Sequence, residues 1–332
     1  EPLAGALAAG NTVVVKPSAY APASSAVLRQ ICEEAFEPEL VSVIEGGRAE
    51  NEALLDQRWD NIFFTGSVAV GKLVMARAAE HLTPVTLELG GKSPCIVERS
   101  ANLRVAARRI AFGKWLNVGQ TCVAPDYVLV DREIKDELIG LIREECENMY
   151  GSASPAFGKM VNRKHFDRVM GLIDPTKVVM GGHGNERTLR IEPTIMDNVT
   201  PADAVMSQEI FGPVLPVMAY DGLEEALRFV EERPTPLALY LFTARHALAR
   251  RVMREVPFGG GCVNDTIMHL ATSRMGFGGM GASGMGSYHG RKSFEAFTHE
   301  KSIMDKATWF DAPFRYQPYA AWKRFFVRKF VH

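Results

Sequence analysis

Short apolar runs alternate with amphipathic stretches along the N-terminal part of the chain. The runs are typical of buried strands, and the stretches between them repeat their apolar residues at helical spacing. Such alternation is typical of βαβ units, in which helices cover both faces of a parallel sheet. The expected strands span residues 12–15, 40–44, 62–64 and 85–89, and the expected helices span residues 3–9, 23–36, 51–55 and 68–79.

A second stretch of the same kind follows Gly90-Gly91, so we predict an α/β fold throughout. A glycine-rich loop at 276–290 and a basic, aromatic tail close the chain. The expected strands here span residues 127–130, 214–219 and 237–243, and the expected helices span residues 103–116, 133–150, 223–232 and 247–256.

The composition excludes several classes of protein. Apolar residues make up 47% of the chain and charged residues 23%, which is ordinary globular usage. The 38 basic and 39 acidic residues give a net charge of −1, so no global field draws the chain to nucleic acid. No apolar run approaches the length of about 18 residues that a membrane-spanning helix needs.

The cysteines and histidines indicate neither disulfides nor a metal site. The five cysteines are odd in number, widely spaced and free of C-x-x-C pairs, which favours a reducing compartment, and we expect a cytoplasmic protein. The eight histidines are scattered without metal-ligand spacing. The cysteines are Cys32, Cys95, Cys122, Cys146 and Cys262.

Two glycine motifs resemble nucleotide-binding sequences incompletely. The segment Gly66-Ser-Val-Ala-Val-Gly71-Lys72-Leu73 fails as an ATP-binding loop, because Leu73 replaces the hydroxyl residue that holds Mg²⁺. Gly66 and Ser67 still lie where a strand feeds a helix N-terminus, which attracts phosphate; the alternative is a plain turn. The G-x-G-x-x-G match at 276–281 lacks its strand and helix, and predicts a loop that approaches another backbone or a ligand closely.

Cys122 and Glu88 are the residues that look chemically active. Cys122 follows a helix within a polar, glycine-bearing turn, where N–H dipoles can stabilise a thiolate; the alternative is an inert small apolar residue. Glu88 interrupts an apolar strand just before Gly90-Gly91, at the end where α/β enzymes place functional groups. Burial would raise its pKa toward the range of a general base, whereas the alternative is a salt-bridged structural glutamate.

Six motifs in order along the chain together resemble the aldehyde dehydrogenase superfamily, and its class 3 branch in particular. The resemblance covers essentially the whole chain. The variants Pro125-Asp-Tyr and Ser287-Tyr-His-Gly290 point to class 3. The motifs are Val13-Val-Val-Lys16-Pro-Ser18, Phe63-Phe-Thr-Gly66-Ser67, Leu87-Glu88-Leu-Gly-Gly-Lys92-Ser-Pro, Gly119-Gln-Thr-Cys122-Val-Ala-Pro-Asp-Tyr127, Gln208-Glu209-Ile-Phe211-Gly-Pro213 and Gly284-Met-Gly-Ser-Tyr-His-Gly290.

This resemblance implies NAD(P)-dependent oxidation of an aldehyde to a carboxylate. Cys122 would be the nucleophile that forms a thiohemiacetal and then a thioester, and Glu88 would activate the hydrolytic water. NAD or NADP would be the cofactor. Its contacts would be Lys16 at the adenosine ribose, Gly66 and Ser67 at the pyrophosphate with Gly71 in the same motif, Glu209 at the nicotinamide ribose, and Phe211 packed nearby.

The resemblance also implies a division into three parts. Residues 1–91 would form a partial, Rossmann-like NAD(P)-binding domain, residues 92–290 a catalytic domain, and residues 291–332 a segment that returns to the cofactor and oligomerisation region. The asparagine of the family's oxyanion hole lies upstream of the position of Glu1, so we expect an N-terminally truncated chain of impaired activity. The intact parent would be a homodimer.

Three alternatives stay open at this stage. Acylating reductases of the superfamily pass the thioester to coenzyme A and typically lack the base, so Glu88 disfavours them. The chain could instead be a non-catalytic relic of the fold. The tail carries Trp322, Phe325, Phe326 and Phe330 at helical spacing with five basic residues, so it could lie on a membrane surface; we favour a helix packed on its own protein or a dimer mate.

Overall fold

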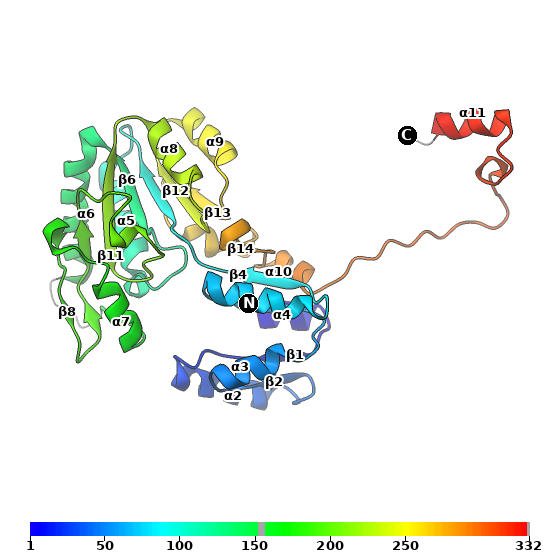
Figure 1. Cartoon of the computed structure of the whole chain (residues 1–332), viewed down its shortest axis with the longest axis horizontal. Helices are drawn as coiled ribbons and strands as arrows, with labels where there is room; N and C mark the ends of the chain where they lie inside the picture. The colour runs from blue at the N-terminus through cyan, green and yellow to red at the C-terminus, as the bar shows by residue number, and fades with distance from the viewer. Residues whose placement is uncertain (152–156, 331–332) are drawn as a thin grey trace. The chain divides into compact units, whose positions relative to one another are not determined.

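The computed structural model describes residues 1–151 and 157–330, and these form two compact units, residues 1–298 and 299–332. The first unit holds a large sheet whose strands run parallel except for β7 at one edge, which is antiparallel to β10 (Figure 1). The strands in spatial order are β13 (Gly260–Val263), β12 (Ala238–Phe242), β5 (Pro94–Val97), β6 (Tyr127–Asp131), β11 (Val214–Tyr220), β10 (Thr194–Met196) and β7 (Val178–Met180).

Helices cover both faces of the large sheet. The connections from β5 to β6 and from β12 to β13 run in opposite directions across the sheet, so right-handed crossovers place their helices on opposite faces. Figure 1 accordingly shows α5 and α6 grouped together, apart from α8 and α9. The strands between them are buried on both faces. The helices are α5 (Leu103–Trp115), α6 (Lys135–Tyr150), α7 (Arg163–Met170), α8 (Leu223–Glu231) and α9 (His246–Glu255).

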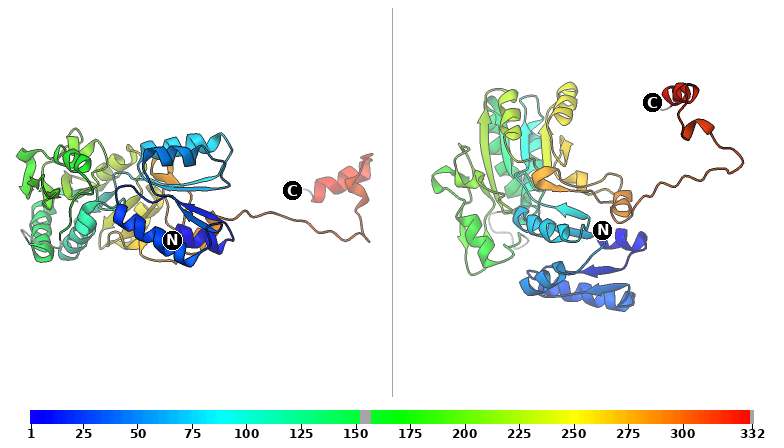
Figure 2. Two further views of the ribbon diagram at one scale, coloured as in Figure 1. Left: turned by 90° about the horizontal axis from the view of Figure 1, so that it is seen from below. Right: turned by 45° about the vertical axis from the view of Figure 1, so that its right-hand side comes forward.

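A smaller sheet combines β3 (Ile62–Thr65), β4 (Val85–Glu88) and β14 (Gly284–Met285). Strand β3 runs parallel to β4, whereas β14, from the far end of the unit, runs antiparallel to it. Figure 2 shows this late segment beside the early strands. Helix α4 (Val68–Ala79) covers one face, because Val74 and Leu87 belong to one apolar cluster.

The N-terminal elements form a short parallel pair, β1 (Val13–Val15) and β2 (Val41–Val43), joined by a helix. A separate antiparallel hairpin lies within the segment between α7 and β10. The remaining elements are α1 (Pro2–Ala8), α2 (Pro22–Ala35), α3 (Arg48–Leu55), β8 (Gly184–Asn185), β9 (Arg190–Ile191) and α10 (Arg291–Ala296) in the first unit, and α11 (Ala321–Phe330) in the second.

The predicted α/β class is confirmed, and the predicted strands and helices are all present. The close approach to another backbone predicted for residues 276–281 is also confirmed, since a Cβ on Gly259 would overlap the Gly278 carbonyl oxygen. The stretch at 276–290, predicted as a loop, includes one short strand, because residues 284–285 form β14. The division at residues 91 and 290 stays a prediction.

Candidate active site

The turn that carries Cys122 has a strained backbone. Directly after α5, the residues Asn117, Val118 and Gly119 adopt φ values of 51°, 60° and 71°. A left-handed conformation is costly for a β-branched residue such as Val118, and such strain persists only where the surroundings enforce it. At Gly119 a side chain is also sterically excluded, because its Cβ would overlap the Gly212 carbonyl oxygen.

Hydrogen bonds to a neighbouring segment hold this turn in place. The Gln120 side-chain amide donates to the Lys159 carbonyl oxygen at 3.1 Å and accepts from the Val161 N–H at 2.9 Å. At the end of α5, the Trp115 indole N–H donates to the Pro213 carbonyl oxygen at 3.0 Å. The turn is therefore fixed from both sides, which positions the thiol that follows.

Cys122 is half-buried, and its thiol is mainly in the neutral form. Burial and the carboxylates of Glu209 and Glu88 raise the thiol pKa to about 12, while the backbone N–H groups of Cys122 and Val123 act in the opposite direction. Charges influence one another in this way only at short range. The fold thus brings together the three residues that sequence analysis placed at the reaction centre.

Glu88 is an unpaired buried carboxyl group at the end of β4. It is 3% exposed, and both carboxyl oxygens are buried without a hydrogen-bond partner. Burial raises its pKa to about 8. Residues 1–151 and 157–330 provide no ion pair to it, so the alternative of a salt-bridged structural glutamate finds no support. A carboxyl with such a pKa is suited to accept a proton near neutral pH.

Glu209 approaches the backbone that follows β4. A Cβ on Gly90 would overlap the Glu209 carboxylate in its present position, so the two lie in direct contact. Burial and the charge of Asp126 raise the pKa of Glu209 to about 8, whereas the Gly91 N–H, Arg168 and Lys92 lower it. Phe211, two residues later, has a φ of 45°.

A buried ion pair holds the Glu209 loop against the Cys122 turn. The Lys92 ammonium donates to the Asp126 carboxylate, to the Val205 carbonyl oxygen at 2.9 Å and to the Gln208 carbonyl oxygen at 3.0 Å. The other Asp126 oxygen accepts the Ile210 N–H at 2.9 Å. Asp126 therefore connects the segment after Cys122 to the loop that carries Glu209.

The residues predicted for the adenosine and pyrophosphate contacts lie around β1 and the start of α4. The Ser67 hydroxyl accepts the Val70 N–H at 3.4 Å and caps α4. Gly71 is buried against the Leu89 side chain, which lets α4 approach β4 closely. The Lys16 ammonium donates to the Gly46 and Pro17 carbonyl oxygens at 2.7 and 2.8 Å.

Comparison with known proteins identifies the family. The family described as "Aldehyde dehydrogenase family" matches residues 1–303. The chain belongs to the aldehyde dehydrogenase family. It is 48% identical to a 4,4'-diaponeurosporen-aldehyde dehydrogenase of Staphylococcus aureus over 96% of this chain and 71% of that protein. It is 43% identical to aldehyde dehydrogenase family 3 member A2 of Rattus norvegicus over 99% of this chain and 70% of that protein.

Solved aldehyde dehydrogenases share the fold. A structure titled as a substrate-bound state of Staphylococcus aureus AldH superimposes with a TM-score of 0.96 at 47% identity, covering all of this chain and 73% of the other. An indole-3-acetaldehyde dehydrogenase in complex with NAD⁺ superimposes with a TM-score of 0.84 at 32% identity, covering 91% and 64%. The resemblance to class 3 enzymes is thereby confirmed, and the acylating alternative is not favoured.

The family's cofactor, NAD or NADP, fits the residues present. Within the described residues, the Val68 and Ala69 N–H groups at the start of α4 have no acceptor, which suits a phosphate oxygen. Half-buried Glu209, whose carboxylate lies against Gly90, offers that carboxylate to a ribose hydroxyl. Ser67 caps α4 and Lys16 follows β1, and these are the two elements expected to flank the adenosine half of the cofactor.

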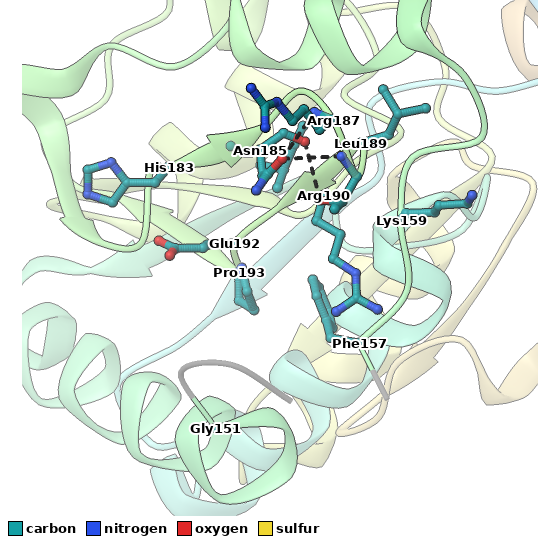
Figure 3. Close-up of a pocket in the computed structure, with 13 residues that line it drawn as sticks. Gly151, Phe157, Lys159, His183, Asn185, Arg187, Leu189, Arg190, Glu192 and Pro193 are labelled. Atoms are coloured by element: carbon teal, nitrogen blue, oxygen red, sulfur yellow. Dashed lines mark hydrogen bonds between the residues drawn. The ribbon is translucent and has the colours of Figure 1, made fainter. Parts of the chain in front are cut away.

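A cavity of about 760 Å³ lies elsewhere in this aldehyde dehydrogenase. It is formed mainly by the hairpin of β8 and β9, and none of the predicted site residues lines it (Figure 3). In the part of the chain that the structure describes, no group of three or more His, Cys, Asp or Glu side chains could hold a metal ion. No described helix has the length and apolar character needed to span a bilayer.

Sequence reasoning did not select Lys92, Asp126 or Tyr288 as site residues. All three lie inside the motifs that carried the resemblance. A buried charge costs free energy unless it is paired, so an aspartate directly before the apolar strand 127–130 was a usable signal for Asp126. Its partner Lys92 could not be predicted without the tertiary fold.

Proposed function

We propose that Cys122 and Glu88 perform the two halves of aldehyde oxidation to a carboxylate. The observation that carries this assignment is the buried Glu88 carboxyl group, which has no partner of its own and interacts electrostatically with the Cys122 thiol. A structural glutamate in such a place would leave an unsatisfied group at a cost of a few kcal/mol. A catalytic role explains why a carboxyl group lies at this buried position.

In the first half, the Cys122 sulfur attacks the carbonyl carbon of the aldehyde. The carbonyl π bond breaks as the C–S bond forms, and the carbonyl oxygen takes up the proton that the thiol gives up, which yields a thiohemiacetal. The N–H groups of Cys122 and Val123 stabilise negative charge at this turn. When bound, NAD or NADP supplies the hydride acceptor that converts the thiohemiacetal into a thioester. Glu209 would hold the nicotinamide ribose, with Lys16, Gly66, Ser67 and Gly71 placed along the remaining cofactor path.

In the second half, Glu88 accepts a proton from a water molecule as its oxygen attacks the thioester carbon. The C–S bond then breaks, the carboxylic acid leaves and Cys122 is regenerated. This step requires ionised Glu88, so it is lost as the pH falls below the pKa of about 8.

The test is Glu88→Gln with Glu209→Gln as the matched control, because both side chains are carboxyls whose pKa is raised to about 8. Each variant is treated with p-nitrophenyl acetate, which acylates the thiol without a cofactor. We expect Glu88→Gln to accumulate acetyl-Cys122, detectable by intact mass, with hydrolysis slowed about a hundredfold or more. Glu209→Gln should hydrolyse acetyl-Cys122 at the normal rate, whatever the removal of its charge does to acylation. Normal hydrolysis by Glu88→Gln would exclude Glu88 as the base.

We further propose a homodimer in the cytoplasm. A relative from Rattus norvegicus, 46% identical over 92% of this chain, is named "Aldehyde dehydrogenase, dimeric NADP-preferring", which supports the dimer. All five cysteines are free, which is consistent with a reducing compartment. We assign the tail helix to packing on protein rather than to a membrane surface.

A further inference from the structure

The two faces of the small sheet differ in character. Leu87 and Leu89 face α4 and belong to its apolar cluster. Side chains alternate along a strand, so Thr86 and Glu88 project from the opposite face. On β3, Phe63 is in register with Thr86, and Thr65 with Glu88, so these side chains share the Glu88 face.

Tyr288 lies on this second face. Its ring packs edge-on against the Phe63 ring, with 4.9 Å between centroids. Gly286, two residues earlier, lies so close to Thr86 that a Cβ would come within 2.9 Å of its methyl group. The glycine loop therefore holds the Tyr288 ring over the face that carries the base.

The surroundings fix the position of the Tyr288 ring. The Tyr288 backbone exchanges two hydrogen bonds of 2.8 Å with Phe277, and its ring also contacts His289 edge-on at 4.4 Å. Within residues 1–151 and 157–330, its hydroxyl makes no hydrogen bond. Burial and the charges of Glu88, Cys122 and Glu1 raise the phenol pKa to about 12, so the hydroxyl remains a donor near neutral pH and lies close to the reaction centre.

We propose that Tyr288 is a positioning residue for Glu88, whose hydroxyl donates a hydrogen bond to the Glu88 carboxylate when that group is ionised. The Glu88 oxygens otherwise have no donor, and the glycine loop holds the phenol ring over the sheet face from which Glu88 projects. The O–H bond stays intact: water loses its proton to Glu88, and the phenol only stabilises the charge. The inference rests on the role proposed for Glu88 above.

A hydrogen bond to the ionised form lowers the pKa of a carboxyl, so removing it raises that pKa. Ionised Glu88 is the active form, and the acid limb of the hydrolysis rate therefore moves to higher pH in Tyr288→Phe. The other ionisable groups around this face are Cys122 from its turn, His289 from the glycine loop and Glu1 beside it, with Glu209 beyond Cys122 and His269 beyond His289. Tyr288→Phe leaves all of them in place.

The experiment measures hydrolysis of acetyl-Cys122 by rapid quenching and intact mass between pH 6 and pH 10. The variants are Tyr288→Phe, which keeps the ring, and Phe63→Leu, which disturbs the packing of the same ring but removes no hydroxyl. We expect Tyr288→Phe to keep normal acylation and to shift the acid limb up by about one pH unit. Phe63→Leu should leave the limb where it is.

An acid limb unchanged in Tyr288→Phe would overturn the positioning role. A limb that shifts equally in Phe63→Leu would also overturn it, because packing alone would then explain the effect. If Glu88 is not the general base at all, the result is different: Glu88→Gln then hydrolyses acetyl-Cys122 at the normal rate.

Discussion

The residues around Lys16 bear on which nicotinamide cofactor the enzyme accepts. In NAD-preferring relatives a glutamate often lies three residues after this lysine, where it binds the ribose 2′-hydroxyl and repels a 2′-phosphate. Here that position is Ala19, which is exposed. The nearby carboxylate of Glu45 is paired with Arg29 at 3.4 Å. Neither residue presents a free carboxylate that would exclude NADP.

We therefore predict that the enzyme uses NADP with an efficiency within about tenfold of NAD, a difference of about 1.4 kcal/mol. Ala19→Glu should lower kcat/KM for NADP by more than tenfold and leave that for NAD nearly unchanged, and Ala19→Gln supplies the uncharged control. Steady-state kinetics with both cofactors measure this. A preference of the unmodified enzyme for NAD above a hundredfold would contradict the prediction.

At the scale of elements, the strained turn between α5 and Cys122 is sensitive to substitution. Gly119→Ala adds a Cβ that overlaps the Gly212 carbonyl oxygen at a φ of 71°. We expect a loss of about 2 kcal/mol or more in the free energy of unfolding, together with slower acylation of Cys122. Denaturant unfolding and the ester assay measure the two effects.

Gly140 in the middle of α6 provides the matched control. A Cβ there meets nothing within 4 Å, and the residue is helical. Gly140→Ala should stabilise the protein by about 0.5–1 kcal/mol and leave acylation unchanged. Equal behaviour of the two variants would show that the strain of the turn does not position the thiol.

At the same scale, apolar patterns in the sequence were sufficient to predict several of the strands. Apolar runs such as 85–89 predicted strands because burial on one or both faces selects those residues. The pattern missed β5, which begins at Pro94, and β13, which begins with Gly260-Gly261, because proline and glycine are poor strand formers. Local sequence context was enough to single out Cys122 and Glu88 as candidate site residues. It could not show that Glu88 has no hydrogen-bond partner, because that depends on β14 and the glycine loop.

For the molecule as a whole, the tail helix is the element whose apolar face calls for a partner. In the second unit α11 is formed as predicted, and the Phe314 and Phe326 rings stack with 5.9 Å between centroids. Trp322, Phe325 and Phe326 nevertheless stay exposed, so the helix presents an apolar face to its surroundings. We assign that face to contacts with protein.

We predict that the protein does not co-sediment with vesicles rich in anionic lipid, whether intact or truncated before Trp322. Vesicles of neutral lipid serve as the control for adventitious sedimentation. Co-sedimentation of the intact protein alone, reversed by raising the salt concentration, would instead identify the basic aromatic helix as a membrane-surface element.

The pairing of Gly284 with Glu88 in the small sheet has a consequence for how the protein matures. The two residues are 196 positions apart in the chain (284 − 88). Closing a loop of this length is entropically costly, and the contact has a high contact order. The carboxyl is enclosed only when the late glycine loop reaches the early strand. During synthesis, we therefore expect Glu88 to stay an ordinary solvent-exposed acid until residues 284–285 have emerged. By that point all the strands of the large sheet have also been synthesised.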